Sequence, residues 1–223
     1  MIYAAPPATN LSVSPARLAI VAPASRRLEL RNGGAEPLAI EIVHRSLTVG
    51  GVPWLSVRPS RFVLRAGARG VLTLHARTGN APPGDHELRL LFTGRPVRDA
   101  RIGVRLRLGI GVRVRIRGRV VRLVDVRGLH VGKTRHARVL RLSLVNRGNV
   151  TEQLGGRVSV ALVRNGRAFS RLRARTRLQL FPGARTVLDL RYRGRTRGPV
   201  TAVATVALGH GVRRVERRYR LRL

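Results

Sequence analysis

Apolar and polar residues alternate with a period of two along most of the chain. The longest such stretch runs from Arg101 to Arg117, where every even position is apolar and every odd position is arginine or glycine. Because successive side chains of a strand point to opposite faces of a sheet, this pattern predicts a strand with one buried face. Shorter stretches with the same alternation lie at residues 28–30, 38–42, 72–76, 88–92, 140–144 and 188–190.

Clusters of glycine, proline and asparagine separate the alternating stretches. Such turn signals lie at residues 32–34, 66–67, 82–84, 165–166 and 182–183. No stretch shows a convincing period of 3.6 residues, which an amphipathic helix requires. Short strands at regular spacing, each with one apolar and one polar face, favour an all-β chain of antiparallel sandwiches.

The two halves of the chain share two sequence motifs. The pattern L-x-L-x-N-x-G lies at residues 28–34 and again at 142–148, and L-x-x-G-A-R-x-V-L-x-L lies at 64–74 and again at 180–190. The second copies follow the first by 114 and 116 residues. Two matches in the same order at nearly one offset predict a tandem duplication.

The predicted domain boundary lies near Gly118, where the apolar residues shift from even to odd positions. A boundary there gives two domains of about 110 residues, each large enough to bury roughly 65% of its unfolded surface. The small residues and prolines at the start are typical of the segment around a signal-peptide cleavage site. We therefore expect a disordered segment or signal-peptide remnant at 1–10 and β-sandwiches at 11–117 and 118–223.

Several short motifs resemble the immunoglobulin-like domains of the PapD-like group. They are NLSVSPAR at residues 10–17, LELRN at 28–32, WLSVRP at 54–59, FVLRAG at 62–67 and PGDHEL at 83–88. The resemblance implies a fold of two tandem immunoglobulin-like antiparallel β-sandwiches. The tandem arrangement is similar to bacterial cell-surface proteins of the WxL-interacting type, whose first domain is associated with peptidoglycan binding.

The chain is strongly basic. It has 45 Lys plus Arg against 10 Asp plus Glu, a net charge of +35, and all but one of the basic residues, Lys133, are arginines. A hydrophobic content of 43% excludes a disordered basic tail. The composition of a GC-rich genome accounts for arginine in place of lysine, but it does not account for so few acids. The charge therefore predicts an anionic partner.

Two sets of residues are candidates for contact with such a partner. Arg105, Arg107, Arg113 and Arg115 lie on the outward face of the longest predicted strand, where like charges destabilise one another and a bound anion would relieve the repulsion. The alternative is that these guanidinium groups extend into solvent over the sheet. Trp54 is a candidate ligand-contact aromatic, and its alternative is a packing role at the core.

The sequence contains no arrangement typical of an enzyme. The carboxylates are scattered singly, the six histidines show no metal-ligand spacing, and cysteine is absent. Residues 128–134 resemble a phosphate-binding loop but have one residue too few between the glycines, and we interpret them as a surface loop. We expect no catalytic activity, no cofactor, no metal and no small-molecule substrate.

These observations predict a non-catalytic protein that is extracellular or in the cell envelope and binds an anionic cell-wall polymer or a surface protein. Non-specific polyanion binding is expected, and no apolar stretch is long enough to span a membrane. The first alternative is a periplasmic PapD-like assembly chaperone that captures client strands by β-augmentation. Pilus chaperones of that group anchor a client carboxylate with a basic pair, for which Arg17 matches the first member, whereas the only lysine lies in the second half. A basic nucleic-acid-associated protein is the third possibility, although few aromatic residues are available for base stacking.

Overall fold

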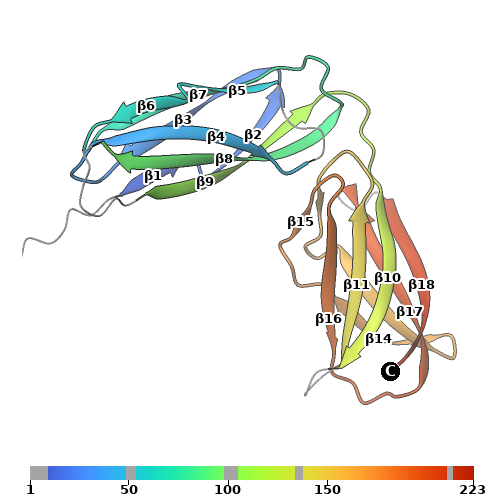
Figure 1. Cartoon of the computed structure of the whole chain (residues 1–223). Coiled ribbons are helices and arrows are strands. Elements are labelled where there is room, and N and C mark those ends of the chain that lie inside the picture. Colours follow the sequence, from blue (N-terminus) through green and yellow to red (C-terminus); the bar gives the residue numbers. More distant parts are fainter. Residues whose placement is uncertain (1–9, 49–53, 98–104, 134–137, 210–212) are drawn as a thin grey trace, which may run out of the picture. The chain divides into compact units, whose positions relative to one another are not determined.

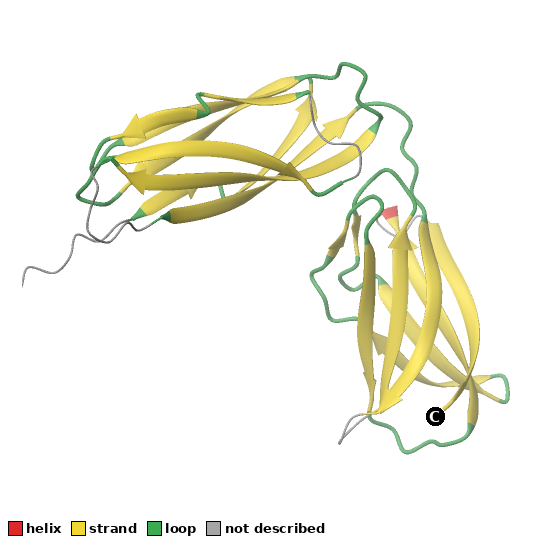
Figure 2. Ribbon diagram, viewed as in Figure 1, coloured by secondary structure: helices red, strands yellow, loops and turns green. Residues whose placement is uncertain are grey.

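The computed structural model describes residues 10–48, 54–97, 105–133, 138–209 and 213–223 (Figure 1). The chain consists almost entirely of strands and loops (Figure 2). It divides into two compact units, Met1–Gly118 and Arg119–Leu223. Each unit is an immunoglobulin-like β-sandwich, so the predicted all-β fold class is confirmed. The predicted disordered segment or signal-peptide remnant falls outside the described residues except for Asn10.

The first unit contains two facing sheets. Their strand orders are β1-β3-β7-β5 and β2-β9-β8-β4-β6. Neighbouring strands pair antiparallel, except that β2 runs parallel to β9. The strands are β1 (Leu11–Ser14), β2 (Arg17–Ala22), β3 (Ala24–Asn32), β4 (Leu38–Ser46), β5 (Leu55–Arg58), β6 (Arg61–Leu64), β7 (Arg69–Ala76), β8 (Gly84–Pro96) and β9 (Leu106–Ile116).

The chain changes sheet within its first strands. β1 pairs with β3 in one sheet, and after the cis Ser14–Pro15 peptide β2 pairs with β9 in the other. The alternation in the sequence specifies the core between the sheets, because every second side chain of a strand points inward. Leu88, Leu90 and Phe92 of β8 are each fully buried in this core.

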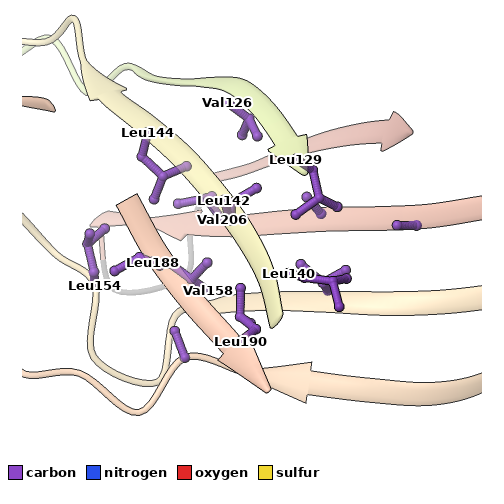
Figure 3. Close-up of a cluster of buried hydrophobic side chains, with 14 of the residues drawn as sticks. Val126, Leu129, Leu140, Leu142, Leu144, Leu154, Val158, Leu188, Leu190 and Val206 are labelled. Carbon is purple, nitrogen blue, oxygen red and sulfur yellow. The ribbon is translucent and has the colours of Figure 1, made fainter. Parts of the chain in front are cut away.

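The second unit also contains two main sheets. Their orders are β10-β11-β16 and β14-β13-β17-β18, and β12 and β15 form a short additional pair. The strands are β10 (Val124–Lys133), β11 (Arg138–Asn146), β12 (Glu152–Gln153), β13 (Val158–Arg164), β14 (Arg167–Arg173), β15 (Gln179–Leu180), β16 (Arg185–Tyr192), β17 (Pro199–Leu208) and β18 (Arg213–Arg222). Figure 3 shows its core, in which Leu140, Leu142 and Leu144 of β11 face side chains of the opposite sheet such as Val158 and Val206.

The repeated sequence motifs form the same hydrogen bonds in both units. Asn32 and Asn146 each end a strand and are fully buried. The side-chain Nδ2 of Asn32 donates to the carbonyl of Leu64 at 3.2 Å, and that of Asn146 donates to the carbonyl of Leu180 at 2.8 Å. Each Oδ1 accepts a hydrogen bond from the backbone N–H two residues later, at 3.0 and 2.9 Å. The motifs therefore specify equivalent strand ends, and the tandem duplication itself stays a prediction.

Residues 128–134 do not form the surface loop that we expected. Gly128–Lys133 lies within β10, in register with β11, and Thr134 is outside the described residues. Leu129 and Val131 lie opposite the buried Leu142 and Leu140, so their side chains continue the inward alternation of a strand. Both glycines of the motif are strand residues: Gly128 lies next to a β-bulge between Val126 and Gly128, and Gly132 pairs with Val139.

Candidate functional site

β9 is paired along its whole length on one side and along only part of its length on the other. On one side β8 pairs with every residue from Leu106 to Ile116. On the other side β2 pairs only with residues 111–116. Over residues 106–110 no described strand pairs with this edge, because the chain before Arg17 has crossed to the other sheet. We call Leu106–Ile110 the open segment of β9.

The open segment presents apolar side chains that are incompletely covered. Leu106 and Leu108 are on the inward face with Ile110, but both are only partly buried, whereas Ile110 is 1% exposed. Arg107 and Gly109 are on the outward face and are exposed. An edge of this kind has backbone N–H and C=O groups and apolar side chains available to an added strand.

The edge strand β18 of the second unit has a different pattern. It pairs with β17 along all ten of its residues, and no described strand pairs with its other edge. Arg213 and Arg217 lie opposite the buried Leu208 and Ala204 of β17, so arginine takes two of its inward positions. Inward-pointing charges on an edge strand oppose the addition of another strand, because pairing would desolvate them. The inward face of the open segment of β9 contains no charged residue.

Two of the four arginines predicted to bind anions are paired with carboxylates of the same unit. Arg115 donates to Asp85 from Nε at 2.6 Å and from Nη2 at 2.8 Å, and Arg113 forms an ion pair with Glu87. The side chain of Asp85 is fully buried. The hydrogen bond to Asp85 raises the pKa of Arg115 above its ordinary value, although partial burial acts in the opposite direction.

These ion pairs place negative charge beside two of the four arginines, and anion binding by Arg113 and Arg115 stays a prediction. Asp85 and Glu87 lie directly opposite Arg115 and Arg113 in the pairing of β8 with β9. The alternation in the sequence does not reveal these pairs, because the partners are 30 and 26 residues apart. The available signal was the spacing of the two acids by two residues, which places both on one face of a strand.

The other two predicted arginines lie at the start of the open segment, Arg105 just before it and Arg107 within it. Arg105 and Arg107 are exposed, and neither forms an ion pair with a described carboxylate. The structure therefore separates the four residues. Arg113 and Arg115 form ion pairs on the part of β9 that β2 covers, residues 111–116, which we call the closed half of β9. Arg107 on the open segment and Arg105 just before β9 form no ion pair with a described carboxylate. Anion binding by these arginines stays a prediction.

Trp54 lies at one end of the core of the first unit. It is half-buried against that core, and its ring meets the ring of His86 edge to face, with the centroids 5.0 Å apart. His86 Nε2 lies 2.8 Å from the carbonyl oxygen of Pro82, which places the histidine next to the turn before β8. This position is that of a packing residue, and a ligand contact by Trp54 stays a prediction.

The described residues also bear on metal binding and on membrane insertion. No cluster of three or more His, Cys, Asp and Glu side chains there has the arrangement of a metal site. In the same part of the chain, no helix has both the length and the apolar character needed to cross a membrane.

The fold is similar to that of pilus chaperones. The class 5 fimbriae chaperone CfaA is 14% identical with a TM-score of 0.56, over 96% of this chain and 98% of CfaA. The E. coli chaperone DraB is 16% identical with a TM-score of 0.50, over 96% and 97% of the two chains. A chain of the complex between the Salmonella enterica SafA pilin and the SafB chaperone is 13% identical with a TM-score of 0.53, over 98% and 99%. No protein-family model and no curated protein sequence matches the chain.

These comparisons correct two expectations. At such identities they establish the fold, which is the two-domain PapD-like fold, and they do not support the WxL-interacting type. They also contradict the expectation of a protein that binds the cell wall, because the structures that share the fold over nearly the whole chain are chaperones.

Proposed function

We propose that the chain is an assembly chaperone of the cell envelope that captures a surface subunit by β-augmentation. The observation that carries the proposal is the open segment of β9, where one backbone edge is unpaired and the inward side chains of Leu106 and Leu108 are partly exposed. An added client strand would complete the hydrogen bonding of this segment. The chaperone would perform no covalent chemistry.

The geometry of a strand explains how such a site recognises its client. Main-chain hydrogen bonds supply affinity for any extended segment, and side chains that alternate along the strand supply specificity. Leu106 and Leu108 are two residues apart, which corresponds to about 6.7 Å along a strand. A client that lacks part of its own core at that spacing would bury both leucines. The similarity to the chaperone complex that contains a pilin supports a client of the surface-subunit class.

Arg17 offers a second anchor next to the open segment. It begins β2, lies opposite Gly111 of β9 and is exposed. Arg17 therefore marks the position where β2 begins to pair with β9, directly after the open segment ends. A client strand that ends there would place its terminal carboxylate close to the Arg17 guanidinium, which binds carboxylates in a planar, bidentate geometry.

The large positive charge fits a client of opposite charge. A net charge of +35 speeds the encounter with an acidic protein, and salt screens this effect. We therefore expect the association rate of the client to fall steeply with ionic strength while the dissociation rate changes little.

Photo-crosslinking in the source cells tests this function. A photoreactive amino acid replaces Leu108 in one variant and Val215 of β18 in a matched control, since both side chains are partly buried on the inward face of an edge strand. We expect the variant at 108 to crosslink a surface subunit, identified by mass spectrometry, and the variant at 215 to give no such product. Equal products from both positions, or no subunit crosslinked from 108, would overturn the proposal.

A further inference from the structure

A polar hollow lies on the outer face of the sheet β1-β3-β7-β5, which is the sheet of the first unit that does not contain β9. Its volume is about 400 Å³. The polar residues that line it are Ser25, Ser56, Arg58, His75 and Arg77. Small side chains, of two alanines and a proline, form the rest of the lining. The hollow therefore combines space for a small group with several side chains that donate hydrogen bonds.

The register of three strands brings Ser25, Ser56 and His75 together. Ser25 of β3 and Ser56 of β5 both lie opposite His75 of β7, one on each side. Ser25 Oγ is 2.8 Å from His75 Nδ1. When the serine hydroxyl donates to Nδ1, the ring proton lies on Nε2, and the imidazole can donate a second hydrogen bond from that atom. Neighbouring strands are about 4.8 Å apart, so one small ligand can reach both Ser56 and His75.

The charges around the hollow are positive and uncompensated. Arg58 lies one row further along the same face, opposite Thr73, which also faces Arg27. Arg77 follows His75 by two residues. Within the described part of the chain, none of these three arginines forms an ion pair with a carboxylate.

The acidic residue on this face of β3, Glu29, already forms an ion pair. Glu29 lies four residues beyond Ser25, and its Oε1 is 3.3 Å from Nη1 of Arg69. On the closed half of β9, Asp85 and Glu87 neutralise two arginines. In the hollow, by contrast, no carboxylate of the described residues forms an ion pair with Arg58 or Arg77. A bound anion would supply that charge.

We propose that this hollow binds a small oxyanion, a phosphate or a carboxylate group. Arg58 and Arg77 provide the positive charge, and the hydroxyl of Ser56 and the ring of His75 provide directional hydrogen bonds. The site lies in a different sheet from the open segment of β9, so it is separate from the proposed capture of a client strand.

The test follows the imidazole C–H signals by NMR while inorganic phosphate or, in a second arm, acetate is added at constant ionic strength. A background of about 150 mM salt shortens the screening length to about 8 Å and suppresses attraction by the overall charge. His75→Gln identifies the His75 signal. We expect this signal to shift and saturate, more than the signals of the other five histidines. Tighter binding of phosphate would indicate a phosphoryl ligand, and tighter binding of acetate a carboxylate ligand; either result supports an oxyanion site.

Matched variants separate the hollow from general charge. Arg58→Ser with Arg77→Ser removes two exposed arginines of the hollow, and Arg171→Ser with Arg173→Ser removes two exposed arginines of β14 in the second unit. We expect the first pair to weaken binding at His75 at least tenfold and the second pair to leave it unchanged, with both variants melting like the parent. A shift that never saturates, or the same affinity in both pairs, would overturn the proposal.

Discussion

Among the described strands, the open segment of β9 and the edge strand β18 are both unpaired on one edge, but they differ in which faces carry arginine. Both contain apolar residues and arginine, and both have one edge that no described strand pairs with. In the open segment the inward positions are apolar, whereas in β18 two inward positions are Arg213 and Arg217. We therefore expect the face on which arginine lies, and not the amount of arginine, to determine whether an edge accepts another strand.

The two strands also differ in how the rest of their unit holds them. The closed half of β9 is fixed by β2 and by the ion pairs of Arg113 and Arg115. β18 is fixed to the opposite sheet by Tyr219, whose hydroxyl donates to the carbonyl oxygen of Val126 in β10 at 3.1 Å. β9 is therefore held at residues 111–116 and has, at residues 106–110, an edge that no described strand pairs with, whereas β18 is held to the opposite sheet at Tyr219.

We expect the largest effect from a variant that places arginine at an inward position of β9, as β18 has at Arg213 and Arg217. Leu108→Arg places a charge at an inward position of the open segment, and we expect the affinity for the client subunit to fall about 100-fold, which corresponds to about 2.7 kcal/mol. Stability should change little, because Leu108 is already partly exposed. Isothermal titration calorimetry measures the affinity. Val215→Arg makes the same change on β18 and should leave binding intact; comparable losses in both variants would refute the contrast between the edges.

The second effect concerns the closed half of β9. Asp85→Asn removes the charge of a fully buried carboxylate that holds Arg115, and we expect a loss of about 3 kcal/mol in the free energy of unfolding. Since the pKa of Arg115 is raised in the folded state, the contribution of the pair is fully present below the ordinary arginine pKa, and the loss should be the same from pH 7 to pH 9.

Urea denaturation measures this loss as a change in the free energy of unfolding of the first unit. Asp189→Asn is the matched control, because Asp189 is 59% exposed and lies 3.7 Å from Arg141 in the second unit. We expect that control to change stability by less than about 0.5 kcal/mol. Equal effects of the two substitutions would show that the ion pairs of β9 do not hold its closed half.

Replacing an inward arginine of β18 with leucine should allow this edge to pair with another strand. Arg217→Leu leaves an apolar inward face around Val215 and Tyr219, and we expect weak self-association at protein concentrations on the order of 100 μM, through pairing of two β18 edges. Light scattering after gel filtration detects the dimer. Arg218→Leu removes the same charge from the outward face, and it should remain closer to the parent. If Arg218→Leu associates as strongly as Arg217→Leu, overall charge rather than inward charge protects this edge.

The smallest effect is expected at the contact that secures β18. Tyr219→Phe removes the hydrogen bond to Val126 and should cost about 1 kcal/mol. Burial raises the pKa of Tyr219 above its ordinary value, although Arg217 acts in the opposite direction. The unfolded chain therefore loses this proton first, and stability should fall as the pH rises above about 10. Unfolding at pH 9 and pH 11 should show a smaller decrease in Tyr219→Phe than in the parent; identical decreases would contradict the assignment.

The sequence was sufficient to predict the sandwich fold and most of the strands, but residues 128–133 lie in β10 and not in the predicted surface loop. The alternation around Leu88, Leu90 and Phe92 specifies which face is buried, and the motifs that contain Asn32 and Asn146 mark equivalent strand ends. Period-two alternation reports faces and not neighbours, so it did not show that the chain changes sheet at Pro15.

The candidate site depends on which strands are neighbours, and the alternation does not show that. The open segment exists because β2 begins opposite Gly111, and the ion pairs exist because β8 lies beside β9. Both are contacts between residues far apart in the sequence. Net charge alone could not separate arginines paired inside the fold, such as Arg115, from arginines free to meet a partner, and it favoured the wrong function.

Hydrogen exchange of the backbone amides shows directly whether a client strand pairs with the open segment of β9. The protein is compared with and without a saturating client subunit, and exchange is followed in the open segment of β9 and in β18. We expect residues 106–110 to exchange at least tenfold more slowly in the complex and residues 213–222 to be unchanged. A complex that forms while the open segment keeps its exchange rate, or that protects β18 instead, would contradict the account.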